Sequence, residues 1–183
     1  FINKLPTNIL VVIDQRYIDF STLGKDDLNG LDYINNENII SIRTFNNFYS
    51  IENLELTYII GNLELTKLIR DSQVINPIDK FTEKLALNVY KDNYYNKIKT
   101  KIIKEKKRIM EILDKHNIEY LPSDTNFFLI KTKKSKDEIE EDLEQRGIIL
   151  YKSLDSYHNY WTLPINTKEI NDKLIDTILY SEL

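Results

Sequence analysis

The sequence of 183 residues contains no cysteine, and this absence excludes several kinds of chemistry. Without thiols the chain has no disulfide framework, no thiolate zinc site and no cysteine nucleophile. Glycine is also scarce, with four residues in the whole chain, roughly a third of its usual frequency of about 7%. Glycine-rich loops that hold phosphate groups through backbone N–H groups are therefore not expected.

Long apolar stretches are missing too. The longest apolar run, residues 9–13, is far shorter than the roughly 20 residues that cross a bilayer. Nothing near the N-terminus resembles a signal peptide. We therefore expect a soluble intracellular protein of the cytoplasm or an organelle matrix, without membrane contact. Because the first residue is Phe1 rather than methionine, we also expect a fragment, a processed form or one half of a split protein.

Two further kinds of partner are not expected. The two histidines, His116 and His158, lie far apart without ligand spacing, so we predict no metal site. The basic segment 97–108 contains an apolar stripe at helical spacing. That pattern favours a solvated helix face over a nucleic-acid surface.

The first half of the chain predicts an α/β arrangement. Apolar segments at 9–14, 38–45 and 56–61 are typical of strands buried on both faces, as in a parallel sheet. Helices are predicted at 63–71, from 76 to about 90, and at 94–116.

The second half predicts a small α+β lobe. It contains a strand at 120–132 interrupted by Pro122-Ser123, an acidic helix at 135–146 and a strand at 147–151. A strand at 160–165 and a helix capped by Thr167 complete the lobe. From residue 120 onward the order is β-α-β-β-α.

Several short motifs follow one another along the chain. An apolar strand ending in Asp14 precedes Gln-Arg-Tyr-Ile-Asp-Phe at 15–20, Ser-Ile-Arg-Thr-Phe-Asn-Asn-Phe occupies 41–48, and Leu-Glu-Leu-Thr-Tyr-Ile-Ile-Gly-Asn occupies 54–62. Leu-Pro-Ser-Asp-Thr-Asn-Phe-Phe at 121–128 and Arg-Gly-Ile-Ile at 146–149 come later. In this order and spacing they resemble the C-terminal half of fold-type-I, pyridoxal-phosphate (PLP) aminotransferases of the histidinol-phosphate type.

This resemblance implies a domain organisation. Residues 1–93 would be the remnant of the large PLP-binding domain, a partial sheet of three strands with helices. Residues 94–117 would form a linking helix, and 118–183 a small C-terminal α+β domain. The family's glycine-rich phosphate loop and its Asn-Pro-x-x-Pro-Thr-Gly segment would belong to the half that this sequence lacks.

The resemblance also implies roles for individual residues. In such enzymes a lysine holds PLP as a Schiff base, and a carboxylate keeps the pyridine nitrogen protonated. Asp14 would pair with that nitrogen and Tyr17 would hydrogen-bond the phenolic oxygen of the ring. Both residues match the family pattern, Asp-Glu-Ala-Tyr, in which Ala stands at the position of Arg16.

Other positions depart from the pattern. Asn47 occupies the position of the Schiff-base lysine, and an amide cannot condense with an aldehyde. Asn46 replaces a phosphate-binding serine, and Glu55 replaces a phosphate-binding arginine. In the small domain Thr162 stands at the place of the arginine that clamps the substrate carboxylate.

The family's glycines near residue 47 are replaced by Ser50, Asn53 and Thr57. Because glycine tolerates positive φ without strain, we expect the loop to have changed shape.

From these departures we expect a catalytically inactive chain without PLP, a pseudoenzyme that serves as a structural or interaction subunit of a larger assembly or of a dimer with a paralogue. One alternative is the C-terminal half of a split PLP-dependent aminotransferase of the histidinol-phosphate type. A second is a small-molecule sensor that uses the residual pocket around Asp14 and Tyr17.

We also expect a protein partner that covers the first half of the chain. The apolar strands of the first half need cover on both faces and neighbours at their edges. Three strands and two short helices do not supply all of this cover and strand pairing. We therefore predict that the 1–75 region is buried against other polypeptide over more than about 1,000 Å².

Overall fold

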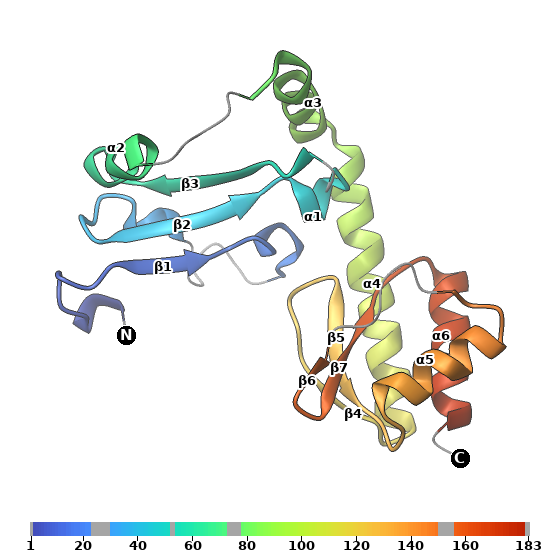
Figure 1. Ribbon diagram of the computed structural model, residues 1–183. Coiled ribbons are helices and arrows are strands. Elements are labelled where there is room, and N and C mark those ends of the chain that lie inside the picture. The colour runs from blue at the N-terminus through green and yellow to red at the C-terminus, as the bar shows by residue number, and fades with distance from the viewer. Residues whose placement is uncertain (1, 23–29, 52–53, 73–77, 150–155, 182–183) are drawn as a thin grey trace. The chain divides into compact units, whose positions relative to one another are not determined.

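The computed structural model describes residues 2–22, 30–51, 54–72, 78–149 and 156–181 (Figure 1). The chain divides into two compact units, Phe1–Tyr95 and Asn96–Leu183. Each unit combines a β-sheet with helices, so the α/β class expected from the sequence is confirmed. The assignment of 1–93, 94–117 and 118–183 to parts of an aminotransferase stays a prediction.

The first unit is built on a sheet in the order β1-β2-β3. Its elements are η1 (Ile2–Lys4), β1 (Val11–Asp14), η2 (Ile18–Phe20), η3 (Gly30–Tyr33), β2 (Ile39–Thr44), α1 (Asn46–Tyr49), β3 (Thr57–Gly61), α2 (Leu63–Ser72) and α3 (Lys80–Lys91). β1 runs parallel to β2, with Val11 opposite Ile39 and Asp14 opposite Ile42, whereas β3 is antiparallel to β2. The carboxyl ends of β1 and β2 therefore meet at one edge, where the segments after Asp14 and Thr44 begin.

The prediction that these strands are buried on both faces is correct only in part. Ile39, Ile40 and Ser41 of β2 are buried. In β1 the burial alternates along the strand, and Val12 is 50% exposed. The expectation is wrong for β1 because, among the described residues, only β2 pairs with it and no helix covers its second face.

Helices α2 and α3 lie close to the predicted ranges, 63–71 and 76 to about 90. α2 exposes Leu63 and Leu68, and none of its described residues is buried. α3 begins at Lys80 because Asp79 caps it, accepting hydrogen bonds from the N–H groups of Phe81 at 2.8 Å and Thr82 at 3.0 Å. The earlier start expected at residues 76 and 77 lies outside the described residues.

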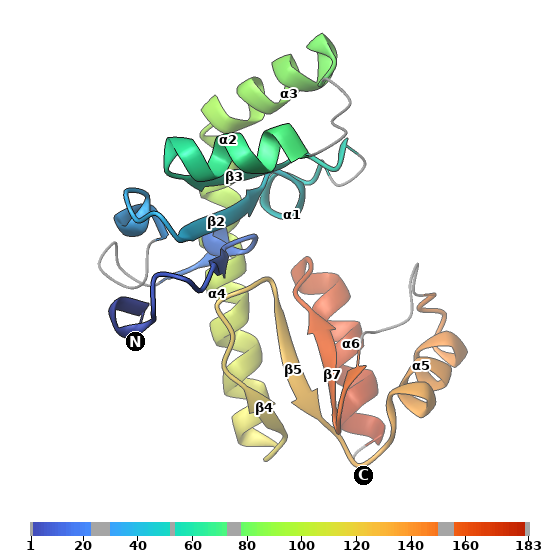
Figure 2. The ribbon, with the colours of Figure 1, turned by 60° about the vertical axis from the view of Figure 1, so that its left-hand side comes forward.

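The second unit contains an antiparallel sheet in the order β4-β5-β7-β6 (Figure 2). Its elements are α4 (Tyr94–Lys115, which begins in the first unit), β4 (Glu119–Leu121), β5 (Phe127–Lys131), α5 (Lys136–Gln145), β6 (Ser156–Tyr157), β7 (Tyr160–Pro164) and α6 (Lys168–Ser181). Side chains that alternate along β5 and β7 point to one face and pack with α4, α5 and α6 into a core; they are Phe128, Ile130, Trp161 and Leu163.

Two details of this unit differ from the expectation. The chain is not a strand at residues 147–149, since Gly147 turns back with φ of 76° after α5 and Ile149 is exposed; residues 150 and 151 lie outside the described part. The short strand β6 was not predicted. The observed order from β4 onward is β-β-α-β-β-α, because the break at Pro122-Ser123 divides one predicted strand into β4 and β5.

Candidate functional site

The carboxylate of Asp14 lies at the carboxyl end of β1 and is held by a residue two positions away. Both Arg16 Nε and the Arg16 backbone N–H donate to Oδ1 at 3.0 Å. Arg16 Nε also lies 3.0 Å from Oδ2, and Nη2 donates to Oδ2 at 2.7 Å. These bonds from Arg16 lower the pKa of Asp14. Because both side chains are about half exposed, at 51% and 54%, the pair faces solvent.

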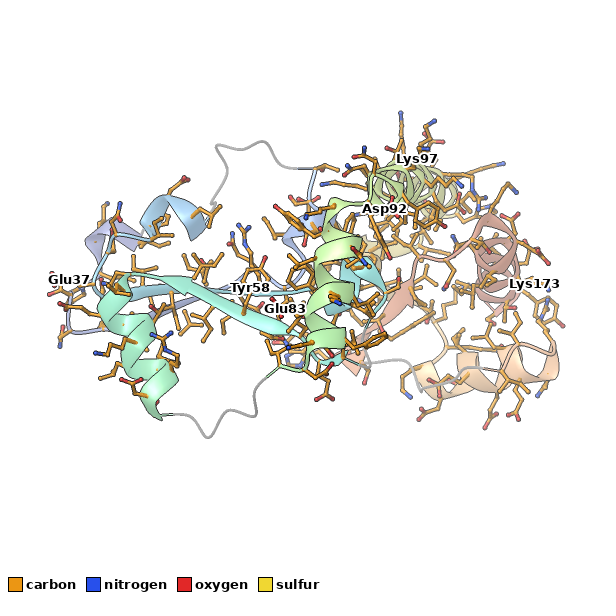
Figure 3. The ribbon with its side chains drawn as sticks, turned by 90° about the horizontal axis from the view of Figure 1, so that it is seen from above. Glu37, Tyr58, Glu83, Asp92, Lys97 and Lys173 are labelled. Carbon is orange, nitrogen blue, oxygen red and sulfur yellow. The ribbon has the colours of Figure 1, made fainter. Side chains whose placement is uncertain are left out.

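The residue after Asp14 links the first two strands. Gln15 is buried, and its Oε1 accepts hydrogen bonds from Arg43 Nε at 3.2 Å and Nη2 at 3.1 Å. Arg43 in turn lies opposite Tyr58 in the pairing of β2 with β3, and Tyr58 projects from β3 in Figure 3. The segment that follows β1 is thereby fixed to the centre of the sheet.

Helix α1 carries the two asparagines predicted to stand at cofactor positions. Asn47 Nδ2 donates to the carbonyl oxygen of Arg16 at 3.3 Å, which joins α1 to the segment after β1. Asn46 Oδ1 accepts from the backbone N–H of Leu56 at 2.8 Å. Asn47 therefore lies beside the segment that follows Asp14, whereas the side-chain oxygen of Asn46 closes the loop that leads to β3.

The loop between α1 and β3 contains two residues with left-handed backbone. Ser50 ends α1 with φ of 53° and ψ of 42°, and Glu55 has φ of 47°. Glu55 is exposed, and Asn53 lies outside the described residues. Ser50 thus adopts the conformation in which a glycine would be unstrained, and the expected change in the shape of the loop stays a prediction.

Tyr17 is half-buried beside a group of aromatic rings. Its ring centroid lies 6.2 Å from that of Phe20, which meets Phe48 of α1 edge-on at 5.2 Å. Phe48 contacts Tyr49 at 5.1 Å. Burial raises the pKa of Tyr49 to about 12. These ring contacts connect Tyr17, through Phe20, to α1.

Thr162 belongs to the second unit, in β7. It lies opposite Leu129 of β5 and is half-buried, while its neighbours Trp161 and Leu163 belong to the core. The Thr162 side chain is therefore on the sheet face that points away from the core. The structure groups Asp14, Tyr17, Asn46, Asn47 and Glu55 within the first unit and leaves Thr162 in the other.

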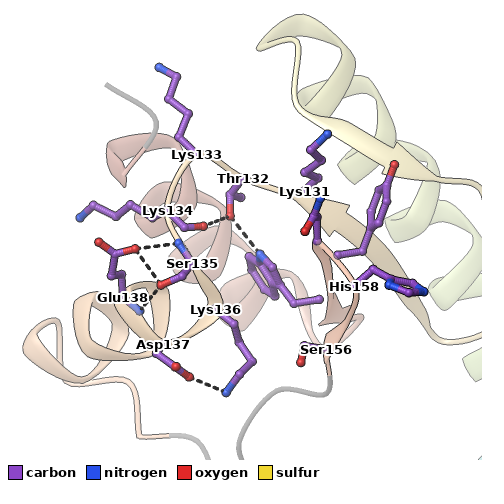
Figure 4. A pocket seen from close by; sticks show the side chains of 13 residues that line it. Lys131, Thr132, Lys133, Lys134, Ser135, Lys136, Asp137, Glu138, Ser156 and His158 are labelled. Carbon is purple, nitrogen blue, oxygen red and sulfur yellow. Dashed lines mark hydrogen bonds and ion pairs between the residues drawn. The ribbon is translucent and has the colours of Figure 1, made fainter.

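A pocket of about 520 Å³ lies in the second unit, and none of the predicted site residues lines it (Figure 4). Its rim comes from the segment that joins β5 to α5 and from residues 156–161. Most of its lysines are paired; Lys131 lies 3.2 Å from Glu119, Lys134 2.6 Å from Asp142 and Lys136 2.9 Å from Asp137. This pairing leaves little excess positive charge for an anion.

Sequence reasoning missed the contact between Arg16 and Asp14. The available signal was an acid and a base two residues apart directly after a buried strand. Of the described residues, no three His, Asp or Glu side chains gather as metal ligands would, and no helix there is long and apolar enough to cross a membrane.

Comparison with known proteins gives consistent matches. The family model for aminotransferase class I and II matches residues 2–174. Histidinol-phosphate aminotransferase of Lysinibacillus sphaericus is 30% identical over 155 residues, which cover 82% of this chain and 41% of that protein. The enzyme of the same name from Pelagibacter ubique is 30% identical over 186 residues, 96% of this chain and 50% of the relative. The chain thus spans about half the length of the curated relatives that it matches.

A solved structure has the same fold. Histidinol-phosphate aminotransferase from Sinorhizobium meliloti, in complex with pyridoxal-5′-phosphate, superposes with a TM-score of 0.82 over 98% of this chain and 50% of that chain, at 19% identity.

These matches correct two expectations. The expectation of an inactive chain is wrong, because the relatives matched over most of its length are named aminotransferases, which are enzymes. The expected loss of PLP is wrong too, since the family is PLP-dependent and the Sinorhizobium meliloti structure holds PLP. Both rested on residues of this chain alone: Asn46, Asn47, Glu55, Thr162 and the replaced glycines. A site that half of a protein helps to form also depends on the charges and hydrogen-bond donors of the other half.

Proposed function

Because the chain belongs to the aminotransferase class I and II family, we propose that it is the C-terminal half of a PLP-dependent aminotransferase that acts on histidinol phosphate. One observation carries this proposal: the family match runs through residues 2–174, and Asp14 lies within it at the carboxyl end of β1. The names of the relatives support the choice of substrate.

The residues present fit one part of the cofactor. The Asp14 carboxylate has the charge to accept a hydrogen bond from the N–H group of a pyridinium ring, which keeps the nitrogen protonated, and the Tyr17 hydroxyl can donate to a phenolic oxygen. When bound, PLP withdraws electrons from the carbon that bears the substrate amine. Asn47 does not fit the role of an imine-forming lysine, so we assign this chain contacts with the ring and no step through residue 47.

A partner is part of the proposal. β1 is an edge strand among the described residues, and side chains on or next to it are exposed: Ile9 by 44%, Leu10 by 53% and Val12 by 50%. An apolar edge of this kind invites another strand. We assign this edge to the half of the aminotransferase that the chain does not match, with more than about 1,000 Å² of total interface against the 1–75 region.

The ring contact can be tested with a probe that has no aldehyde. Pyridoxine 5′-phosphate cannot form imines with surface lysines, so calorimetric titration of the chain assembled with the other half reports non-covalent binding only. We expect Asp14→Asn to weaken binding at least ten-fold, because hydrogen bonds to charged groups contribute roughly 1.5–3 kcal/mol. Asp32→Asn is the matched control, since Asp32 is exposed on η3 of the same unit. Equal affinity for Asp14→Asn and Asp32→Asn would contradict the assignment.

The partner can be tested in the native source. A C-terminal tag on the chain, followed by purification and mass spectrometry, should recover the other half of an aminotransferase, either on the same polypeptide or in equal amount on a second one. Recovery of a stable monomer of 183 residues, whose β1 amides exchange as slowly as those of β2, would contradict this part of the proposal.

A further inference from the structure

Arg16 is the unexpected residue at the Asp14 site. The resemblance places a small alanine there, whereas this chain carries a guanidinium directly over the carboxylate. A guanidinium remains charged at every ordinary pH and presents its donors in a fixed fork that matches a carboxylate. The interaction is therefore available whenever Asp14 is ionised.

Counting acceptor sites shows how fully Arg16 occupies this carboxylate. An ionised carboxylate offers about four lone-pair sites on its two oxygens. Three N–H groups of Arg16 make four contacts with Asp14, two on Oδ1 and two on Oδ2, because the single Nε–H is shared between the oxygens. A cationic N–H group of a ligand needs one of the same sites, so it competes directly with the Arg16 side chain.

The Arg16 backbone is held at the same time. Its N–H donates to Asp14, and its carbonyl oxygen accepts from Asn47 Nδ2 at 3.3 Å. Only the side chain of Arg16 is then left to move, and that side chain is 54% exposed. The guanidinium can swing into water while the two loops stay joined.

We propose that Arg16 is an internal gate, whose guanidinium occupies the Asp14 carboxylate in the empty chain and leaves it when a cationic ring nitrogen binds there. The gate rests on the proposed function, because it presumes that Asp14 receives a pyridinium ring. It makes Arg16 a positioning residue that sets the affinity for the ring without contacting it in the bound state.

The test compares Arg16→Ala with the wild type in titrations with pyridoxine 5′-phosphate. Because exposed ion pairs contribute roughly 0.2–1 kcal/mol, removal of the gate should tighten binding up to about five-fold. Loss of a positive charge alone should weaken binding of a phosphate ester. Tighter binding of the probe to Arg16→Ala would therefore show that Arg16 competes with the ligand for Asp14. Arg70→Ala, at an exposed arginine of α2, controls for the change in net charge and should not tighten binding.

A second probe separates the ring nitrogen from the rest of the ligand. In the analogue with a C–H group in place of that nitrogen, Arg16→Ala should not tighten binding. Arg16→Lys should give an intermediate affinity for pyridoxine 5′-phosphate, because an ammonium makes a point contact rather than a fork.

The outcomes distinguish the two claims. If Asp14→Asn weakens binding but Arg16→Ala leaves it equal or weaker, the gate is wrong and the proposed function stands. If neither wild type nor Arg16→Ala binds the probe when assembled with the other half of the aminotransferase, both are wrong. Without any ligand, Arg16→Ala should raise the pKa of Asp14 in a carbon-13 NMR titration, and an unchanged pKa would also overturn the gate.

Discussion

Replacing Ser50 with glycine should stabilise the loop that joins α1 to β3. Ser50 has φ of 53° and ψ of 42°, a conformation that costs an L-residue roughly 1–2 kcal/mol. Glycine avoids this cost but loses about 0.5–1 kcal/mol through its greater freedom in the unfolded chain. The difference predicts a net gain of about 0.5–1 kcal/mol.

Amide exchange gives a local assay for this gain. The N–H groups of Ile51 and Leu56 donate to Asn46, to its backbone oxygen at 3.2 Å and to its side-chain oxygen at 2.8 Å. In Ser50→Gly their exchange should slow about two- to five-fold. Ser50→Ala retains a β-carbon and is the matched control, for which we expect no slowing. Faster exchange in the glycine variant would refute a left-handed Ser50.

Three further changes test other parts of the structure. Ser41→Ala should stabilise the chain to urea by about 1 kcal/mol, because the Ser41 hydroxyl is buried without a hydrogen-bond partner in the described structure; a loss would mean that the hydroxyl is satisfied. Leu143→Ala should cost about 2–5 kcal/mol, followed by Trp161 fluorescence, while the exposed Leu87→Ala should cost far less. Hydrogen bonds to Glu105, mainly from Arg108, lower the pKa of its carboxyl from 4.5. The stability that Glu105 contributes to the fold is therefore present above about pH 4.5 and is lost as the pH falls through the folded pKa. The difference in urea midpoint between wild type and Glu105→Gln should shrink from pH 7 to pH 3, and a constant difference would contradict this.

Much of the fold follows from sequence patterns alone. The apolar segments near Asp14 and Thr44 predict the parallel pair β1 and β2, and helical spacing with charged flanks predicts α4 and α5. These elements are specified locally, by periodicity and capping, so the chain itself carries the signal.

Other features depend on what surrounds an element. Val12 looks like a buried strand residue, yet it is half exposed because burial depends on what covers the strand. The conformation of Ser50 could not be deduced, since its residue type disfavours positive φ and only the bonds closing the loop impose it. The sequence places a base two residues after the acid Asp14, but the hydrogen bonds from the Arg16 guanidinium to both Asp14 oxygens depend on the exact path of the backbone after β1.

The most direct test of the account is the PLP content of the protein purified from its native source together with the other half of the aminotransferase. PLP released by denaturation can be quantified against the amount of the 183-residue segment. We predict about one PLP per segment in the wild type, a clear loss in Asp14→Asn and no loss in Asp32→Asn. A complete assembly without PLP, or one whose PLP content is the same in Asp14→Asn as in the wild type, would contradict the claim that this chain binds the ring of the cofactor.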